Sequence, residues 1–247
     1  AMNARALPLI VGLLALGTLA GLADAQTLLI GETAVGKMAG IGSTHDIYVD
    51  LAAGDRVILK LKARGGGMAP DMTVTTPNGA PMGAASNRKN VKLVVSAPVT
   101  GTYRVRLTAN SGKVAGFLLE LKGPKQREYH GSSGMVDFGV VAGSTLEIKV
   151  RSSRGTSATV ADPLGTRGQA VILTVEARGR KLDASSGPIV STDQLRMAYG
   201  PANAKATVKV RYPTPRGRID LGNAPAPVPN VPDPTTNGGN PPAPPAP

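Results

Sequence analysis

The chain of 247 residues contains no cysteine, no tryptophan and only two histidines. Without cysteine it can form neither a disulfide nor a thiolate metal site, and no thiol is present to carry a lipid. Its stability must therefore come from hydrophobic cores. Two Phe and five Tyr are its only aromatic residues, which disfavours sugar recognition by stacking on rings. The rings left as candidates for exposure are Tyr129, Tyr199 and Tyr212.

Catalytic motifs are also missing. His45 begins a predicted strand beside Asp46, and His130 lies in a polar connecting segment, so neither indicates a catalytic triad. The chain has no Gly-x-Ser-x-Gly elbow and no His-x-x-x-His pair. Residues 65–67 are glycines, but the Lys-Ser/Thr of a phosphate-binding loop does not follow them. The sequence therefore predicts a protein without enzymatic activity.

The two ends differ in composition from the middle. Arg5 precedes an apolar run from Leu7 to Leu22 and a small-x-small cleavage site at 23–25, which predicts a signal peptide over residues 1–25. The alternative is an uncleaved membrane anchor. Residues 223–247 include ten prolines and predict a disordered tail, either an inert spacer or a docking motif. We expect a secreted, periplasmic or cell-surface protein with no transmembrane segment after signal removal.

Two segments of the middle region repeat each other. Residues 53–62 (AGDRVILKLK) and 142–151 (AGSTLEIKVR) both begin with Ala-Gly, and in both aliphatic side chains alternate with polar ones. Alternating hydrophobic residues also precede each copy, at 47–51 and 136–140. The spacing of the copies is that of a whole domain, so the repeat predicts two tandem β-domains.

Short alternating strands separated by Gly, Pro and Asn turns fill both copies, and no helical periodicity follows the leader. This pattern predicts an all-β protein of two tandem antiparallel β-sandwiches, jelly-roll-like in type. We expect the first sandwich over residues 26–122, a hinge over 123–131 and the second, divergent sandwich over 132–222. A polar loop is expected over 181–187.

The first copy resembles a known family. Residues 46–51 (DIYVDL), 53–57 (AGDRV), 71–79 (DMTVTTPNG) and 97–107 (APVTGTYRVRL) are similar in order and spacing to bacterial pre-peptidase C-terminal (PPC) domains. The second copy keeps the Ala-Gly turn and Pro163-Leu164-Gly165, but lacks the closing Gly-Thr-Tyr. The resemblance implies small jelly-roll-like sandwiches of the kind appended to secreted enzymes. Some of these sandwich domains bind calcium or polysaccharide.

The net charge of +12 does not change when the predicted leader is removed, because the leader holds one Arg and one Asp. For a secreted protein this charge favours anionic partners, such as an acidic polysaccharide or another envelope polymer, and no nucleic-acid motif accompanies it. The alternative is that cations on outer strands prevent edge-to-edge aggregation. The candidate surface residues are outward-facing on predicted strands or clustered near 180: Lys60, Lys62, Arg104, Arg106, Lys149, Arg151, Arg178, Arg180, Lys181, Lys209 and Arg211.

Four carboxylates lie near strand ends of the first copy and are the candidates for calcium: Asp46, Asp50, Asp55 and Asp71. The alternative is that each bonds the backbone of its own turn. No other cofactor is predicted.

Together these observations predict an exported, non-catalytic binding, adhesion or envelope-matrix protein. Two further hypotheses remain open. The sandwiches could pack through strand edges into a fibre or surface layer, or the chain could be an accessory subunit of a separate secreted hydrolase.

Overall fold

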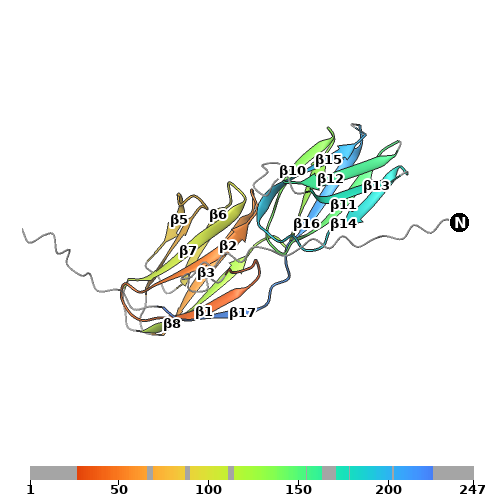
Figure 1. The fold of residues 1–247 in the computed structure, drawn as a ribbon. Coiled ribbons are helices and arrows are strands. Elements are labelled where there is room, and N and C mark those ends of the chain that lie inside the picture. Colours follow the sequence, from red (N-terminus) through yellow and green to blue (C-terminus); the bar gives the residue numbers. More distant parts are fainter. Residues whose placement is uncertain are drawn as a thin grey trace, which may run out of the picture.

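The computed structural model describes residues 27–65, 69–86, 90–110, 114–153, 155–162, 171–177, 179–201 and 203–224. The predicted signal peptide, nearly all of the proline-rich tail and the candidate Arg178 lie outside these residues. The described chain forms seventeen strands and no helix, arranged as two sandwiches (Figure 1). This confirms the predicted all-β fold. Accordingly, no described segment is a helix long and apolar enough to cross a membrane.

The first sandwich consists of two sheets. One has the order β17-β1-β8-β3-β6, formed by Arg218–Asn223, Thr33–Met38, Ala115–Lys122, Arg56–Arg64 and Asn90–Ser96. The other has the order β2-β7-β4-β5, formed by Thr44–Leu51, Gly101–Ala109, Pro70–Thr75 and Pro81–Ala85. Without β17, this is the strand order of an eight-stranded jelly roll.

The second sandwich repeats this topology. Its sheets are β14-β11-β16-β9, formed by Lys181–Ser185, Thr145–Arg151, Lys205–Arg211 and Gln126–Gly131, and β10-β15-β12-β13, formed by Met135–Val140, Asp193–Gly200, Thr156–Ala161 and Val171–Ala177. Each strand occupies the position of the strand eight places earlier in the chain. The sequence repeat is therefore a repeat of the whole fold.

Alternation along the strands fills one hydrophobic core in each sandwich. Leu59 and Leu61 on β3, like their counterparts Ile148 and Val150 on β11, are almost fully buried. The first core is closed by Tyr103 and Phe117, and the second by Phe138. Because successive side chains of a strand point to opposite faces, the residues between these positions lie on the outer faces of the sheets.

Strand β17 is the one element outside the two-fold repeat. After the second sandwich the chain returns to the first, and residues 218–223 pair with β1 in parallel. Ile219, Leu221 and Ala224 then pack on the first core. The sequence instead predicts residues 218–222 as part of the second sandwich and residues 223 and 224 as part of the tail. RIDLGN alternates weakly and carries no information about a partner so far away in the chain.

Two other segments differ from the sequence expectation. The predicted hinge at 123–131 contains β9, and the predicted loop at 181–187 contains β14. Both are edge strands, and among their side chains only Leu182 is buried. An edge strand that buries so little lacks the clear alternation by which a strand is recognised.

Candidate functional site

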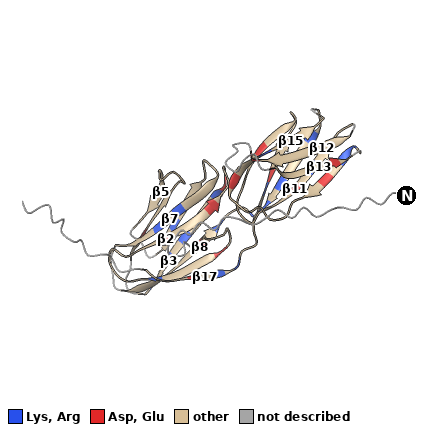
Figure 2. Ribbon diagram, viewed as in Figure 1, with Lys and Arg blue, Asp and Glu red and all other residues tan. Residues whose placement is uncertain are grey.

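The basic residues are unevenly distributed between the sheets. Figure 2 shows lysine and arginine segments on strands of both sandwiches. In the first sandwich, the outer face of β3, β6 and β8 carries one carboxylate, Glu120, among six cations: Arg56, Lys60, Lys62, Arg64, Lys92 and Lys122. We call this set of cations the β3–β6–β8 surface.

The strand register places like charges together on this surface. Lys60 lies directly opposite Lys92 on β6 and opposite Glu120 on β8. Like charges in direct cross-strand pairs are destabilising. Glu120 also forms ion pairs with Lys62, whose Nζ lies 3.5 Å from Oε1, and with Lys122, whose Nζ lies 3.6 Å from Oε2. One carboxylate is therefore shared among several lysines. The surface therefore keeps most of its positive charge.

A second basic surface lies on the second sandwich. The outer face of β11, β14 and β16 carries six cations, which we call the β11–β14–β16 surface: Lys149, Arg151, Lys181, Lys205, Lys209 and Arg211. Arg151 lies directly opposite Lys205 on one side and Lys181 on the other. Three cations thus form one row across three strands.

Several cations of this second surface are paired with carboxylates. Arg211 contacts Glu147 at 2.6 Å, Lys209 contacts Glu128 at 2.9 Å, and Asp183 accepts both Lys181 at 3.0 Å and Arg151 at 3.2 Å. Hydrogen bonds from these cations lower the pKa of Glu147, Glu128 and Asp183. Among the described residues, Lys149 and Lys205 have no ion-pair partner.

Arg104 and Arg106 do not belong to a basic surface. They lie on the outer face of β7, in the opposite sheet of the first sandwich, together with three aspartates. The Arg106 guanidinium binds Asp46 through two bonds, of 2.8 and 2.7 Å, which lower the pKa of Asp46. In the second sandwich Arg196 binds Asp137 in the same way, at 2.6 and 2.9 Å. Counted over the Lys, Arg, Asp and Glu residues of their strands, neither of these two sheets carries a net positive charge.

Lys92 and Lys205 belong to these surfaces but were not among the residues predicted from the sequence. Lys92 alternates with Val91 and Leu93, and that pattern already indicated an outward direction. Lys205 is the first residue of β16, one position before the alternation becomes visible. Arg180 is exposed and precedes β14, so it lies next to the second surface.

The four calcium candidates are not brought together. Asp46 is held by Arg106, Asp50 accepts a hydrogen bond from Thr102 Oγ1 at 2.6 Å, and Asp71 is bonded by the Asn110 side chain. Within the described part of the chain, no three His, Cys, Asp or Glu side chains form a metal-binding group. The carboxylates are instead used locally, because each has a polar partner within its own sheet or turn.

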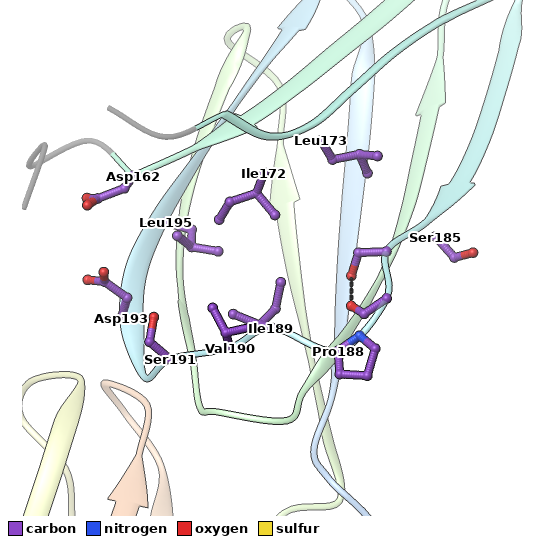
Figure 3. Close-up of a pocket in the computed structure, with 12 residues that line it drawn as sticks. Asp162, Ile172, Leu173, Ser185, Pro188, Ile189, Val190, Ser191, Asp193 and Leu195 are labelled. Carbon is purple, nitrogen blue, oxygen red and sulfur yellow. Dashed lines mark hydrogen bonds between the residues drawn. The ribbon is translucent and has the colours of Figure 1, made fainter. Parts of the chain in front are cut away.

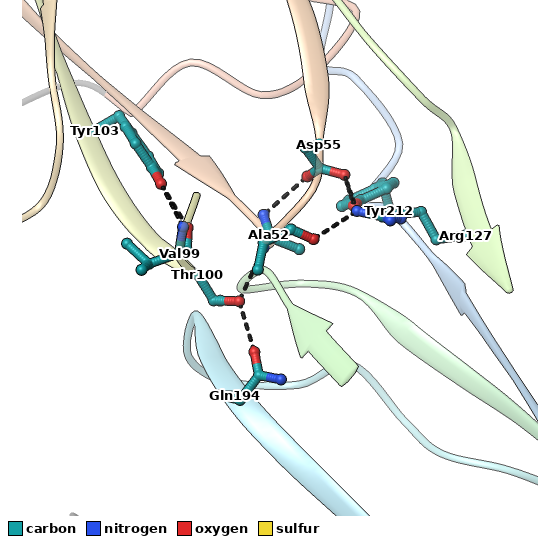
Figure 4. Close-up of polar contacts among 9 residues, drawn as sticks. Ala52, Asp55, Val99, Thr100, Tyr103, Arg127, Gln194 and Tyr212 are labelled. Carbon is teal, nitrogen blue, oxygen red and sulfur yellow. Dashed lines mark hydrogen bonds and ion pairs between the residues drawn. The ribbon is translucent and has the colours of Figure 1, made fainter. Parts of the chain in front are cut away.

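Asp55 has a different role, at the junction of the sandwiches (Figure 4). Its side chain is fully buried, and its Oδ2 accepts the Ala52 backbone N–H at 2.8 Å. Its Oδ1 accepts the Tyr212 hydroxyl at 2.6 Å and lies 3.4 Å from Arg127 Nη1, which also donates to the Ala53 carbonyl at 2.6 Å. Burial and the Asp55 carboxylate raise the pKa of Tyr212. Asp55 therefore ties a turn of the first sandwich to β9, the first strand of the second sandwich, and to the segment that follows β16, its last strand.

Two further contacts close the junction. Thr100 Oγ1 accepts the Ala53 N–H at 3.0 Å and donates to Gln194 Oε1 of β15 at 2.9 Å. Gly139 of β10 packs so tightly here that a Cβ atom would lie 2.9 Å from the Ala52 Cβ and collide with Thr100. The two sandwiches are therefore in direct contact, and at Gly139 there is no room for a side chain.

The histidines and tyrosines singled out in the sequence have ordinary surroundings. His45 is buried against Phe117, with Nε2 3.2 Å from the Lys37 carbonyl, and burial lowers its pKa. His130 is exposed and lies 3.3 Å from Thr207 Oγ1. Tyr199 is buried, contrary to its candidacy for exposure, whereas Tyr129 and Tyr212 are partly buried.

A hollow of about 370 Å³ opens at one end of the second sandwich (Figure 3). Ile172, Ile189, Val190 and Leu195 gather around it, with Asp162 and Asp193 at its margin. Val190 is 84% exposed. The described lining is mainly apolar, unlike the two basic surfaces.

No protein family model and no curated protein matches the chain. Among solved structures, it is similar to a conserved protein of unknown function from Pseudomonas aeruginosa PAO1, at 13% identity and a TM-score of 0.23, covering 74% of this chain and 100% of that one. It is also similar to the N-terminal CBM22-1-CBM22-2 tandem domain of Xyn10C from Paenibacillus barcinonensis, at 14% identity and a TM-score of 0.21, covering 67% and 82%. Similarity at this level assigns no function, and the resemblance to PPC domains stays a prediction.

Proposed function

We propose that the protein is an exported, non-catalytic binding module that holds anionic polymers on its β3–β6–β8 and β11–β14–β16 surfaces. The observation that carries this proposal is the placement of cations directly opposite cations: Lys60 opposite Lys92, and Arg151 between Lys205 and Lys181. Export follows from the predicted signal peptide. An acidic polysaccharide or another envelope polymer is the expected partner.

A like-charge cross-strand pair lowers the free energy of unfolding by about 0.2–1 kcal/mol relative to a neutral pair. A bound polyanion would remove this cost, because its charges would lie between the lysine and arginine side chains. Neighbouring strands are about 4.8 Å apart, so a row such as Lys181–Arg151–Lys205 offers closely spaced contacts to one polymer. Binding of this kind releases counterions and weakens steeply as the salt concentration rises.

The test is retention of the protein on an immobilised sulfated glycan, an acidic envelope polysaccharide and DNA across a salt series. Lys60→Glu and Lys92→Glu should each weaken binding several-fold and reduce the slope of log affinity against log salt by about one. Arg104→Glu is the matched control, because it makes the same charge change on the opposite sheet of the same sandwich. Absence of retention at low salt, or an equal loss with Arg104→Glu, would overturn the proposal.

A further inference from the structure

Strand β9 presents an open edge. It pairs with β16 over all six of its residues, and no described strand lies on its other side. In the repeated fold β9 corresponds to β1, whose outer edge is covered by β17 in parallel. The same edge of the jelly roll thus accepts a ninth strand in the first sandwich, whereas in the second no strand of the described ranges covers it.

The backbone groups at this edge can be assigned from the ladder. The Tyr212 N–H donates to the Lys125 carbonyl, so alternation directs the backbone groups of Arg127 and Tyr129 toward β16. Those of Gln126, Glu128 and His130 point to the free edge, and the side chains of these three residues are exposed. Free N–H and C=O groups in such a row are a template for a further strand.

Four of the other sheet edges, those of β6, β14, β5 and β2, carry features that oppose pairing or are already occupied. Lys92 lies on β6 and Lys181 begins β14, and charged residues of this kind protect strand edges. Strand β5 begins with Pro81, which cannot donate a ladder hydrogen bond, and β2 already has a parallel bridge between Tyr48 and Thr27. Strand β9 contains neither proline nor lysine.

We infer that β9 docks antiparallel against β9 of a second copy of this chain, about a two-fold axis at Tyr129. In an antiparallel pair, residues that lie opposite each other have their side chains on the same face of the sheet. The two-fold axis must therefore lie midway between the two copies of one residue. An axis at Glu128 would place Glu128 opposite itself. An axis at Tyr129 places Glu128 of each copy opposite His130 of the other, so that a carboxylate meets an imidazole twice.

Of these two registers, the charge pattern favours the axis at Tyr129. The strand β17 of another copy is a weaker candidate for this edge, because it is held by its own β1 and its side chains pack on the first core. The paired β9 strands would join two four-stranded sheets into one sheet of eight. The inference depends on the edge and its side chains, not on polymer binding.

The test is the mass of the purified full-length protein in solution, measured by sedimentation equilibrium over a concentration series. The wild type should form dimers. His130→Glu places glutamates opposite each other, and Glu128→Lys places lysine opposite histidine, so each should raise the dissociation constant about tenfold or more. The double variant restores opposite charges in the same register and should recover the dimer.

Glu147→Lys is the control, because it makes the same change on the same face and beside the same Lys209, but on β11, away from the edge. It should leave the dimer intact. Circular dichroism confirms that each variant is folded. A wild type that stays monomeric, single variants that dimerise like the wild type, or a folded double variant that remains monomeric would each overturn the inference.

Discussion

Removal of one hydroxyl at the junction should produce a measurable loss of stability. In Tyr212→Phe the ring remains, but Asp55 Oδ1 loses its 2.6 Å hydrogen bond and keeps only Arg127, at 3.4 Å. The Asp55 side chain is fully buried, so water cannot replace the lost donor without rearrangement. A hydrogen bond to a buried charged group contributes about 1.5–3 kcal/mol, and we expect the free energy of unfolding to fall by about 2 kcal/mol.

The assay is urea unfolding followed by far-UV circular dichroism at neutral pH. Because Tyr212 and β17 pack on the first core, the transition of the first sandwich should move, and the second should change less. Tyr48→Phe is the control, since Tyr48 lies on the outer face of β2. A loss no larger than that of Tyr48→Phe would refute the reasoning. The raised pKa of Tyr212 provides a second check. The stability that the protonated Tyr212 hydroxyl contributes is complete below pH 10 and is lost as the pH rises further. Tyr212→Phe should therefore lose less stability than the wild type when the pH is raised above 10.

Two further predictions concern Glu32 and Gly139. Burial opposes ionisation of Glu32, but hydrogen bonds from the Arg216 side chain, at 3.0 Å, and from the Leu29 and Arg216 backbone lower its pKa below 4.5. The stability that ionised Glu32 contributes is therefore present above pH 4.5 and lost as the pH falls below that value. Glu32→Gln should lower the free energy of unfolding by about 2 kcal/mol at neutral pH, and acidification should lower it less in this variant than in the wild type. Urea unfolding at neutral and at acidic pH measures both differences. Gly139→Leu should collide with Ala52 and Thr100 and separate the sandwiches, raising the radius of gyration in small-angle X-ray scattering while the strand content stays unchanged; an unchanged radius would contradict the described junction.

Alternation along the chain was sufficient to predict the sandwiches. In residues 53–62 and 142–151 the alternation predicts one buried face, because every second side chain of a strand shares a face, and Leu59, Leu61, Ile148 and Val150 on that face are buried. The partner of β17 could not be predicted, since its residues join a strand far away in the sequence. Pairing at that distance depends on the packing of the finished sandwich rather than on local pattern.

For the two basic surfaces too, the sequence predicts some features and not others. Lys60 and Arg106 look alike in the sequence, as outward cations on alternating strands. Their environments differ only through register: Lys60 meets Lys92 across one strand pair, whereas Arg106 meets Asp46 across another. Asp55 likewise sits in a turn like any other, and its bond to Tyr212 joins residues 157 positions apart. The sequence predicts the direction of a side chain but not the neighbour it meets.

The parallel pairing of β1 with β17 also determines how the molecule would respond to tension. Thr33 lies opposite Arg218 and Lys37 opposite Asn223, so a pull on the chain before β1 and after β17 acts at opposite ends of one strand pair. The strands would have to slide past each other, with all their hydrogen bonds strained together rather than broken one after another. The second sandwich, which lies between β8 and β17 in the chain, would be outside the path of the force and would keep its fold while the first resists.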